Sequence, residues 1–324
     1  HIIIKNTMEK RVKTLIIGGG VGGLAAGAAL KEKGDNDFLI VDKCSSLPMN
    51  LNNGVHYLHS DDFGTPFPFE LKKIVAVEEI WDPRKDTFKK TSHVSDMIEY
   101  SLKVMNIRHP SSICDPGTRS WDTFLPMSND MNDLLRSYYE YIGEDHFIWD
   151  CNLASVDIEK KVAAFNGEFL IFYDKIISTA PLDKFCSSCF FEPNVEFKSV
   201  PVYVANYKTE KIVANWLLGL YISDPQFPPY RITILNNIIS MESVKEMTRT
   251  DEEIVKYHLG RYFDYSLDTG HKYTWETGRI FGLSKEQREN VIKFFKKNYI
   301  YLLGRFGTWS GKELMDTTIV SAKK

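Results

Sequence analysis

The sequence predicts an α/β fold that opens on a strand, a turn, a helix and a second strand. The apolar run Leu15 to Ile17 leads into the glycine-rich turn Gly18 to Gly23. The stretch Ala25 to Lys33 follows as a helix, and Phe38 to Val41 forms a second apolar run that ends in Asp42. This order, with an acid at its end, is typical of a nucleotide-binding βαβ unit.

The glycines of the turn have separate physical roles in such a unit. Gly18 allows the tight turn, Gly20 lets the backbone approach a pyrophosphate, and Gly23 lets the helix pack closely on the strand. Gly22 belongs to the same turn, where the helix N-terminus directs free N–H groups and a positive dipole end at the diphosphate. Asp42 is placed to bind the ribose of an adenosine. We predict a bound adenine dinucleotide; a glycine-rich turn without a ligand is the alternative.

Length and composition indicate a globular protein with a small-molecule partner. The 324 residues suffice for two domains or one large two-part fold, and the hydrophobic content of 43% is ordinary. A net charge of −3 provides no overall basic field for nucleic acid, although it does not exclude a local patch. Because no apolar run reaches the roughly 18 residues of a membrane span, we expect no membrane partner. Composition says nothing about the oligomeric state.

Cysteine usage predicts a reducing compartment. With no secretory signal and no framework spacing, the odd number of cysteines favours a cytoplasmic location. Cys186 and Cys189 have the spacing of a redox or metal pair, but no second pair or histidine lies near them, so we interpret them as ordinary thiols and predict no metal site. The segment His1 to Thr7 is interpreted as a tag remnant or upstream sequence. The five cysteines are Cys44, Cys114, Cys151, Cys186 and Cys189.

The remaining elements follow from apolar periodicity and turn residues. Asn166-Gly167 is a strong hairpin signal between two short apolar runs. Lys175 to Pro181 reads as a buried parallel strand, because its apolar run is continuous. Helices are predicted over 94–107, 129–142, 251–264, 284–298 and from about Thr317. Strands are predicted as a pair within 71–90 and over 147–149, 153–158, 162–165, 169–172, 202–204, 216–222, 231–235 and 300–303.

Four segments in order along the chain resemble one family. The first is the opening, residues 14–43. The second, Gly54 to Ser60, is similar to a Gly-x-His-x-x-His-Thr segment. The third, Leu153 to Pro181, is similar to an adenine-side strand, a hairpin and an Ile-Ser-Thr-x-Pro return. The fourth is Tyr301 to Trp309, followed by Met315-Asp316. Together they resemble the flavoproteins of the amine oxidase, protoporphyrinogen oxidase and UDP-galactopyranose mutase superfamily.

This resemblance implies a Rossmann-like, glutathione-reductase-type FAD-binding domain with an inserted α+β substrate domain. The FAD-binding domain would comprise residues 8–60, 147–185 and 290–324. The substrate or cap domain would comprise residues 61–146 and 186–289. The order of the four segments also implies FAD, rather than NAD, as the cofactor.

The resemblance assigns roles to single residues. Gly304 and Arg305 would meet the FAD diphosphate, where a guanidinium can fork onto phosphate oxygens; the alternative is a surface arginine. Met315 and Asp316 would meet the flavin ring. Further cofactor contacts are expected from Lys43, Asn50, Gly54, Leu153 and Thr179.

Two departures from the family pattern affect these expectations. A glycine pair that usually follows the acid is replaced by Pro48-Met49, so the backbone approaches the cofactor differently there or the FAD tail is held differently. A Pro-x-Gly-Gly before the third segment is absent, and Leu125-Pro126-Met127-Ser128 stands in its place. The chain is also short for the family, which implies a reduced substrate domain.

His56 and His59 are the candidate catalytic residues. The resemblance puts their loop against the flavin, where a histidine can hydrogen-bond the cofactor or substrate, or titrate near neutral pH. A purely structural loop is the alternative, and two histidines alone make an incomplete metal site. Trp216, Tyr221, Tyr230 and Arg231 are candidates to line a substrate pocket, although aromatic residues at strand spacing also suit a core.

Three functions are compatible with these residues. The first is an FAD-dependent oxidoreductase that transfers a hydride from a C–N, amine-type, or C–C bond to flavin N5. The second is a non-redox flavin-dependent isomerase resembling UDP-galactopyranose mutase. It would need two cationic side chains for a sugar-nucleotide diphosphate, of which Arg231 is one and the second is not identified. The third is a non-catalytic flavin-binding subunit. The substrate would be a small amine or a nucleotide-linked molecule.

Overall fold

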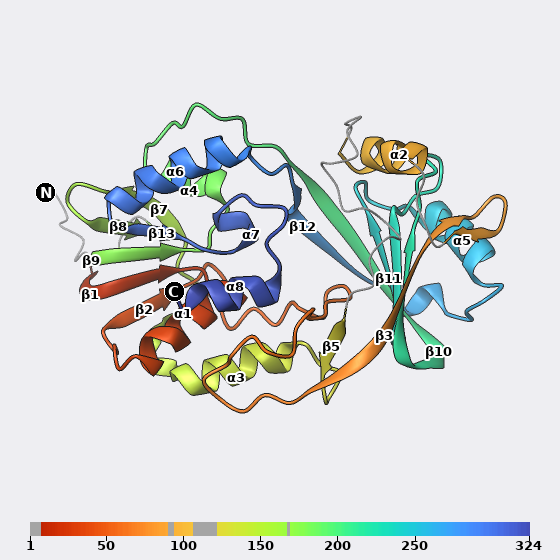
Figure 1. Ribbon diagram of the computed structural model, residues 1–324, viewed down its shortest axis with the longest axis horizontal. Coiled ribbons are helices and arrows are strands. Elements are labelled where there is room, and N and C mark those ends of the chain that lie inside the picture. Colours follow the sequence, from red (N-terminus) through yellow and green to blue (C-terminus); the bar gives the residue numbers. More distant parts are fainter. Residues whose placement is uncertain (1–7, 90–93, 106–121, 167–168) are drawn as a thin grey trace, which may run out of the picture.

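The computed structural model describes residues 8–89, 94–105, 122–166 and 169–324. Two β-sheets organise these residues, one in each half of the molecule (Figure 1). One half carries the opening βαβ unit and both ends of the chain, and the other carries the strands from β10 to β12. This arrangement confirms the predicted α/β fold with a Rossmann-like unit. The interpreted tag segment His1 to Thr7 and the cysteine Cys114 lie outside the described residues.

The first sheet is parallel at its centre and has the order β6-β2-β1-β9, with β13 beside the second part of β9. Leu15 of β1 is in register with Leu39 of β2 and Ile176 of β9. β7 and β8 extend the sheet as antiparallel strands. The strands are β1 (Met8–Ile17), β2 (Phe38–Val41), β6 (Phe147–Ile148), β7 (Leu153–Asp157), β8 (Val162–Phe165), β9 (Phe169–Ser178) and β13 (Ile300–Leu302).

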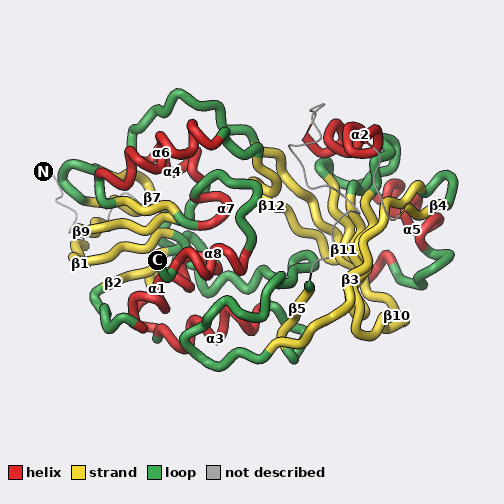
Figure 2. The backbone as a smooth tube through the Cα atoms, viewed as in Figure 1, coloured by secondary structure: helices red, strands yellow, loops and turns green. Residues whose placement is uncertain are grey.

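Helices cover both faces of this sheet (Figure 2). α1 (Val21–Glu32), α3 (Asn132–Ile142) and α8 (Met315–Ala322) lie on one face, where α1 contacts both other helices. α4 (Leu182–Ser188) and α6 (Lys285–Lys297) lie on the other face, and the short α7 (Gly304–Gly307) precedes α8. The sequence analysis assigned α3 to the substrate domain, yet the structure packs it on α1. The domain boundaries stay a prediction.

The second sheet faces the nucleotide half with one side and packs on α5 with the other (Figure 1). β11 pairs with β10 in two runs separated by register shifts, and Tyr230 N donates to the carbonyl of Glu242 at 2.9 Å. The start and end of β11 therefore lie side by side. The strands of the second sheet are β3 (Leu71–Asp82), β4 (Thr87–Lys89), β5 (Thr123–Pro126), β10 (Ser199–Tyr221), β11 (Arg231–Ser243) and β12 (His271–Ile280). The helices of this half are α2 (Val94–Met105) and α5 (Arg249–Leu259). Two short 3-10 helices of the chain are η2 (Glu144–His146) and η3 (Leu267–Thr269).

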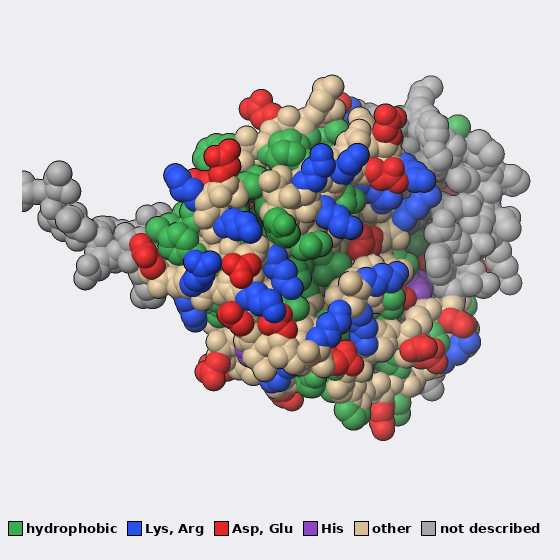
Figure 3. All heavy atoms as spheres, turned by 60° about the vertical axis from the view of Figure 1, so that its left-hand side comes forward, with side chains coloured by type: hydrophobic (Ala, Val, Ile, Leu, Met, Phe, Trp, Pro, Cys, Tyr) green, Lys and Arg blue, Asp and Glu red, His purple; other side chains and the backbone are tan. Residues whose placement is uncertain are grey.

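Most predicted elements form, with shifted ends. The last helix begins at Met315 rather than near Thr317, and the helix predicted over 251–264 ends at Leu259, where Gly260 follows. Within the described residues, no helix has the length and apolar character to span a membrane. Basic and acidic side chains are interspersed on the face shown in Figure 3. Ion pairs in the nucleotide half include Lys13–Asp35 and Arg11–Asp174.

The packing of α3 on α1 generates a stability prediction. Leu134 is fully buried among residues of α1 and the first sheet. Leu134→Ala should lower the free energy of unfolding by about 2–5 kcal/mol, because it removes transfer energy and leaves a cavity. Glu140→Ala, at an exposed position of the same helix, is the matched control. Equal urea midpoints for the two variants would contradict this packing.

Candidate functional site

The glycine turn lies at the carboxyl edge of the parallel strands. Gly18 has a φ of 104°, a left-handed conformation that glycine adopts without strain, and its N–H donates to the carbonyl of Val41 at 2.8 Å. A Cβ on Gly23 would lie 1.8 Å from the carbonyl oxygen of Gly18, so turn and helix touch directly. A Cβ on Gly20 would meet no atom within 4 Å. The backbone at Gly20 is therefore open to a pyrophosphate.

Segments far apart in the sequence converge on this turn. A Cβ on Gly22 would lie 3.1 Å from Cγ2 of Thr179 and 3.2 Å from Cγ2 of Thr318. The hydroxyl of Thr179 donates to the carbonyl of Ile17 at 3.0 Å. Gly307 is held as closely, because its Cβ would lie 2.9 Å from the carbonyl oxygen of Ser178. The ends of β1 and β9 and the starts of α1 and α8 thus surround one position.

Asp42 is the acid at the end of β2, and its carboxylate is fixed by two backbone amides. The N–H of Gly19 donates to Oδ2 at 2.6 Å, and the N–H of Cys44 donates to Oδ1 at 2.8 Å. An ionised carboxylate offers about four acceptor sites. Asp42 therefore keeps free acceptor capacity, and its contact with ribose hydroxyls stays a prediction.

The C-terminal motif packs on the same edge. Gly304 has a φ of 81°, and its N–H donates to Oε1 of Glu313 at 3.2 Å. Arg305 Nε donates to the carbonyl of Glu313 at 2.9 Å, and the hydroxyl of Thr308 donates to Oε2 of Glu313 at 2.6 Å. Glu313, which the sequence analysis did not single out, thus closes the loop between α7 and α8. The contact of Arg305 with a phosphate stays a prediction.

The remaining predicted cofactor residues are spread over the nucleotide half. Asp316 is buried at the start of α8, where its Oδ1 accepts the N–H of Thr317 at 2.9 Å. Met315 packs against the core beneath α1 and α3, whereas Leu153 packs in the cluster on the α4 and α6 face. Lys43 is exposed, and Asn50 is half-buried. Their contacts with a cofactor stay predictions.

The histidine loop is anchored to α3. His56 Nδ1 lies 2.7 Å from the carbonyl oxygen of Leu51, and since a carbonyl only accepts, Nδ1 carries the proton. The N–H of Leu51 donates to Oδ1 of the buried Asn132 at 3.0 Å. Burial lowers the pKa of His56, against the opposing effects of the Leu51 carbonyl and Glu242. His56 is therefore neutral at pH 7, with an Nε2 lone pair that has no hydrogen-bond partner among the described residues.

The two predicted catalytic histidines differ in their surroundings. The ring of His56 approaches Trp275 of β12, with ring centroids 6.2 Å apart, and Gly54 lies near Val204 of β10. His56 thus faces the second sheet. His59 instead packs edge-on against Tyr57, with centroids 5.1 Å apart. Their catalytic roles stay predictions.

A buried group of charged and phenolic side chains occupies the face of the second sheet that looks toward His56. Glu242 forms an ion pair with Arg231 and accepts the hydroxyl of Tyr230 at 2.5 Å. Arg279 Nε donates to the Tyr230 hydroxyl oxygen at 3.3 Å and lies 4.0 Å from Glu242. Burial alone would raise the pKa of Glu242, but Arg231 and Arg279 outweigh burial and hold it below the usual value. Glu242 is therefore an anion.

Arg231 retains a hydrogen-bond donor. Its Nε is buried and has no partner among the described residues. Tyr221, in register with Arg231, donates its hydroxyl to Oε1 of Glu78 at 3.1 Å. The structure thus brings Tyr221, Tyr230 and Arg231 together. Trp216 packs instead with the cluster beneath α5, on the opposite side of the sheet.

Sequence reasoning missed Glu242, Arg279 and Asn132. Glu242 had a visible signal, because it is a lone acid within the otherwise apolar and small-residue stretch of β11. Arg279 and Asn132 had none, since their importance depends on contacts with distant segments of the chain. Only the fold shows these contacts.

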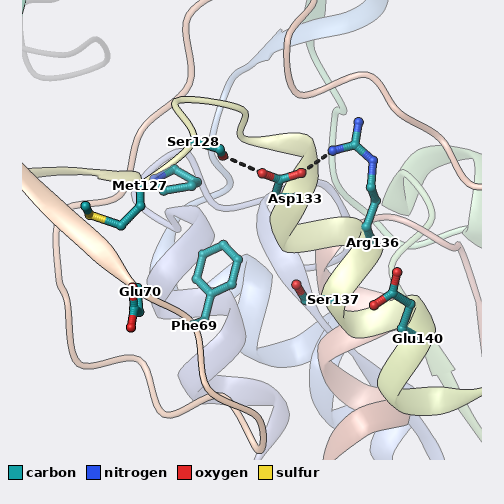
Figure 4. A pocket seen from close by; sticks show the side chains of 9 residues that line it. Phe69, Glu70, Met127, Ser128, Asp133, Arg136, Ser137 and Glu140 are labelled. Atoms are coloured by element: carbon teal, nitrogen blue, oxygen red, sulfur yellow. Dashed lines mark hydrogen bonds and ion pairs between the residues drawn. The ribbon is translucent and has the colours of Figure 1, made fainter.

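The pair Cys186 and Cys189 and a surface pocket do not belong to the groups of residues described above. Burial raises the pKa of both Cys186 and Cys189 to about 12, so neither is poised as a thiolate. The described residues contain no group of three or more His, Cys, Asp or Glu that could hold a metal. A pocket of about 390 Å³ lies between Phe69, Met127 and Arg136, where Asp133 contacts Ser128 and Arg136 (Figure 4). It is an open surface feature, and His56 is not among its lining residues.

Solved structures share this fold. No protein-family model and no curated protein sequence matches the chain. Reduced UDP-galactopyranose mutase aligns with a TM-score of 0.72 at 13% identity, covering 96% of this chain and 92% of that chain. Cyclohexylamine oxidase from Brevibacterium oxydans aligns with a TM-score of 0.62 at 11% identity, covering 96% and 97%. Putrescine oxidase bound to putrescine aligns with a TM-score of 0.58 at 10% identity, covering 97% and 98%.

The chain shares the fold of these solved structures. The likeness confirms the resemblance predicted from the four sequence segments. The open backbone at Gly20, the fixed carboxylate of Asp42 and the convergence on Gly22 fit the adenosine diphosphate part of a dinucleotide. Together these observations support FAD as the cofactor.

The two glycines Gly20 and Gly23 should respond differently to substitution. Gly20→Val should fold, since a side chain there meets no protein atom, but should retain no flavin because valine fills the space of the pyrophosphate. Gly23→Ala should lower the melting temperature of the apoprotein, because its Cβ collides with the Gly18 carbonyl. Flavin absorbance and thermal melts measure both effects. A full equivalent of FAD on Gly20→Val would contradict the assignment of the turn.

Proposed function

We propose that this chain is an FAD-dependent oxidoreductase that takes a hydride from a C–N or C–C bond of a small substrate carrying an anionic group. The observation that carries the proposal is the buried Nε of Arg231, a cationic donor on the sheet face toward His56. When bound, FAD supplies the hydride acceptor. Two amine oxidases share the fold, which supports a C–N bond as the site of oxidation.

An anionic group on the substrate would satisfy Arg231. A buried donor without a partner costs about 1–3 kcal/mol, which a substrate oxygen would recover. Glu242 already neutralises part of the guanidinium charge, and Arg279 brings a second guanidinium to the same carboxylate. A carboxylate or phosphate is the acceptor that an arginine binds best.

His56 provides a proton acceptor at the same face. Its Nδ1–H is held by the Leu51 carbonyl, so Nε2 is the basic atom. A neutral imidazole can take the proton of a substrate ammonium or hydroxyl, and an amine must be neutral before a hydride leaves its carbon. His56 and Arg231 would thus deprotonate and orient the substrate.

A second candidate is non-redox isomerisation of a nucleotide-linked sugar. Arg279 supplies the second cation that the sequence analysis could not identify, beside Arg231. Reduced UDP-galactopyranose mutase also aligns with the higher TM-score. Both observations are compatible with either reaction, because an anionic substrate is common to both.

Anaerobic spectroscopy of the holoprotein separates the two candidates. Amino acids or ω-amino acids should bleach the flavin under the first proposal. Turnover of UDP-galactopyranose only after dithionite reduction would instead establish the second. The double variant Arg231→Met/Glu242→Gln removes one charge of each sign, so the net charge of the group is unchanged. It should raise KM about ten- to a hundred-fold. Retention of FAD with neither reaction would leave a non-catalytic flavin-binding subunit and contradict both.

The lowered pKa of His56 predicts a stability loss in acid. The unfolded chain protonates this histidine near the ordinary histidine pKa of 6.5, whereas the folded chain protonates it only at lower pH. Folding stability therefore falls as pH decreases through and below 6.5. Between about pH 7.5 and 5, the melting temperature of His56→Gln should therefore fall less than that of the wild type.

His271→Gln, at an exposed position of β12, is the control for this comparison. It should retain the wild-type dependence on pH. An identical acid response in wild type and His56→Gln would show that His56 is not buried in its neutral form.

A further inference from the structure

We propose that Trp149 is the stacking platform for the adenine base of the cofactor. The inference rests on the FAD site proposed above but not on the reaction that follows. It adds to that site a residue outside all four sequence segments that resemble the flavoprotein family. The ligand class is a purine nucleotide.

The position of Trp149 places it at the carboxyl edge of the parallel sheet. It follows β6, which pairs with β2, and the chain after it returns to β2 through the N–H of Cys151 on the Asp42 carbonyl at 2.8 Å. In doubly wound sheets, ligands bind outside the carboxyl ends of the strands. The ends of β1, β2 and β6 are therefore the glycine turn, Asp42 and Trp149, in that order.

The indole lies against the glycine turn, close to Asp42. A Cβ on Gly19 would lie 2.9 Å from Cζ3 of Trp149 and 3.2 Å from Cβ of Asp42. The ring and the carboxylate residue therefore flank the same position of the turn. A base attached to a ribose on Asp42 would lie at the same edge of the sheet as this ring.

Only one face of the indole is covered by a parallel ring. Phe147 stacks on Trp149 at 5.1 Å with an interplanar angle of 10°, and Tyr139 is tilted by 37° at 6.2 Å. Side chains two residues apart lie on the same side of a strand, so Phe147 covers the face that looks back along β6. Among the described residues, no ring stacks on the face that looks past the carboxyl end. Trp149 is half-buried, so part of its surface is accessible.

A planar base is the ligand that suits such a surface. Stacking on an aromatic ring requires a π-face but no particular hydrogen-bond pattern. Adenine is the end of FAD that follows the ribose on Asp42, whereas the flavin is expected near His56, where the nucleotide half meets the second sheet. Loss of Trp149 should therefore weaken ADP and FAD but not FMN.

Binding of ADP and FMN to the apoprotein tests the proposal. Trp149→Leu should weaken ADP about five- to 150-fold and leave FMN within about twofold. Trp149→Phe, which restores a π-face, should recover most of the affinity for ADP. Tyr257→Leu, an exposed aromatic on α5 in the other half, should bind both nucleotides as the wild type does.

Fluorescence provides a second measurement that does not require Trp149→Leu to fold. Wild-type emission, from six tryptophans, should be quenched by ADP, and Trp149→Phe should lose the larger part of this quenching. Unchanged ADP affinity in Trp149→Leu, or equal weakening of ADP and FMN, would overturn the proposal. Equal quenching in wild type and Trp149→Phe would do the same. Normal FMN binding with weakened ADP distinguishes this result from loss of the whole flavin site.

Discussion

The close contact between Gly18 and Gly23 is the constraint on which the nucleotide half depends. Because no side chain fits between them, α1 begins directly against the turn that ends β1. That placement brings the helix N-terminus, Asp42 and the end of β9 to one edge of the sheet. The same edge receives α7 and α8 from the C-terminus, so segments far apart in sequence meet at a single candidate cofactor site.

The face of the second sheet toward His56 carries charged side chains rather than apolar side chains alone. Arg231, Glu242 and Arg279 satisfy one another in part, and the remaining donor of Arg231 requires a partner from outside the protein. His56 connects the two halves, because its loop is fixed by Asn132 of α3 while its ring faces β12. A mutation at Asn132 of α3 should therefore displace His56, the proton acceptor that we propose, without touching it.

Local sequence patterns predicted the nucleotide half because its function depends on backbone shape. The glycines, Asp42 and the return strand to Thr179 were visible as a strand–turn–helix unit and its partner. The substrate half was less predictable, because its charged side chains come together only where the start and the end of β11 lie side by side. Tyr230 and Arg231 were identified, but Trp216 lies on the other face. It stands five residues before Tyr221, which is in register with Arg231, and side chains an odd number of residues apart on a strand point to opposite faces. Trp149 carried no signal beyond a short apolar run.

The position of the flavin ring in a crystal structure of the FAD complex tests the account most directly. We predict that the isoalloxazine lies between the loop of His56 and the face of the second sheet that carries Arg231, with the adenosine at Asp42. A dinucleotide bound in the reverse direction, or a flavin ring outside the space between these two elements, would contradict the account.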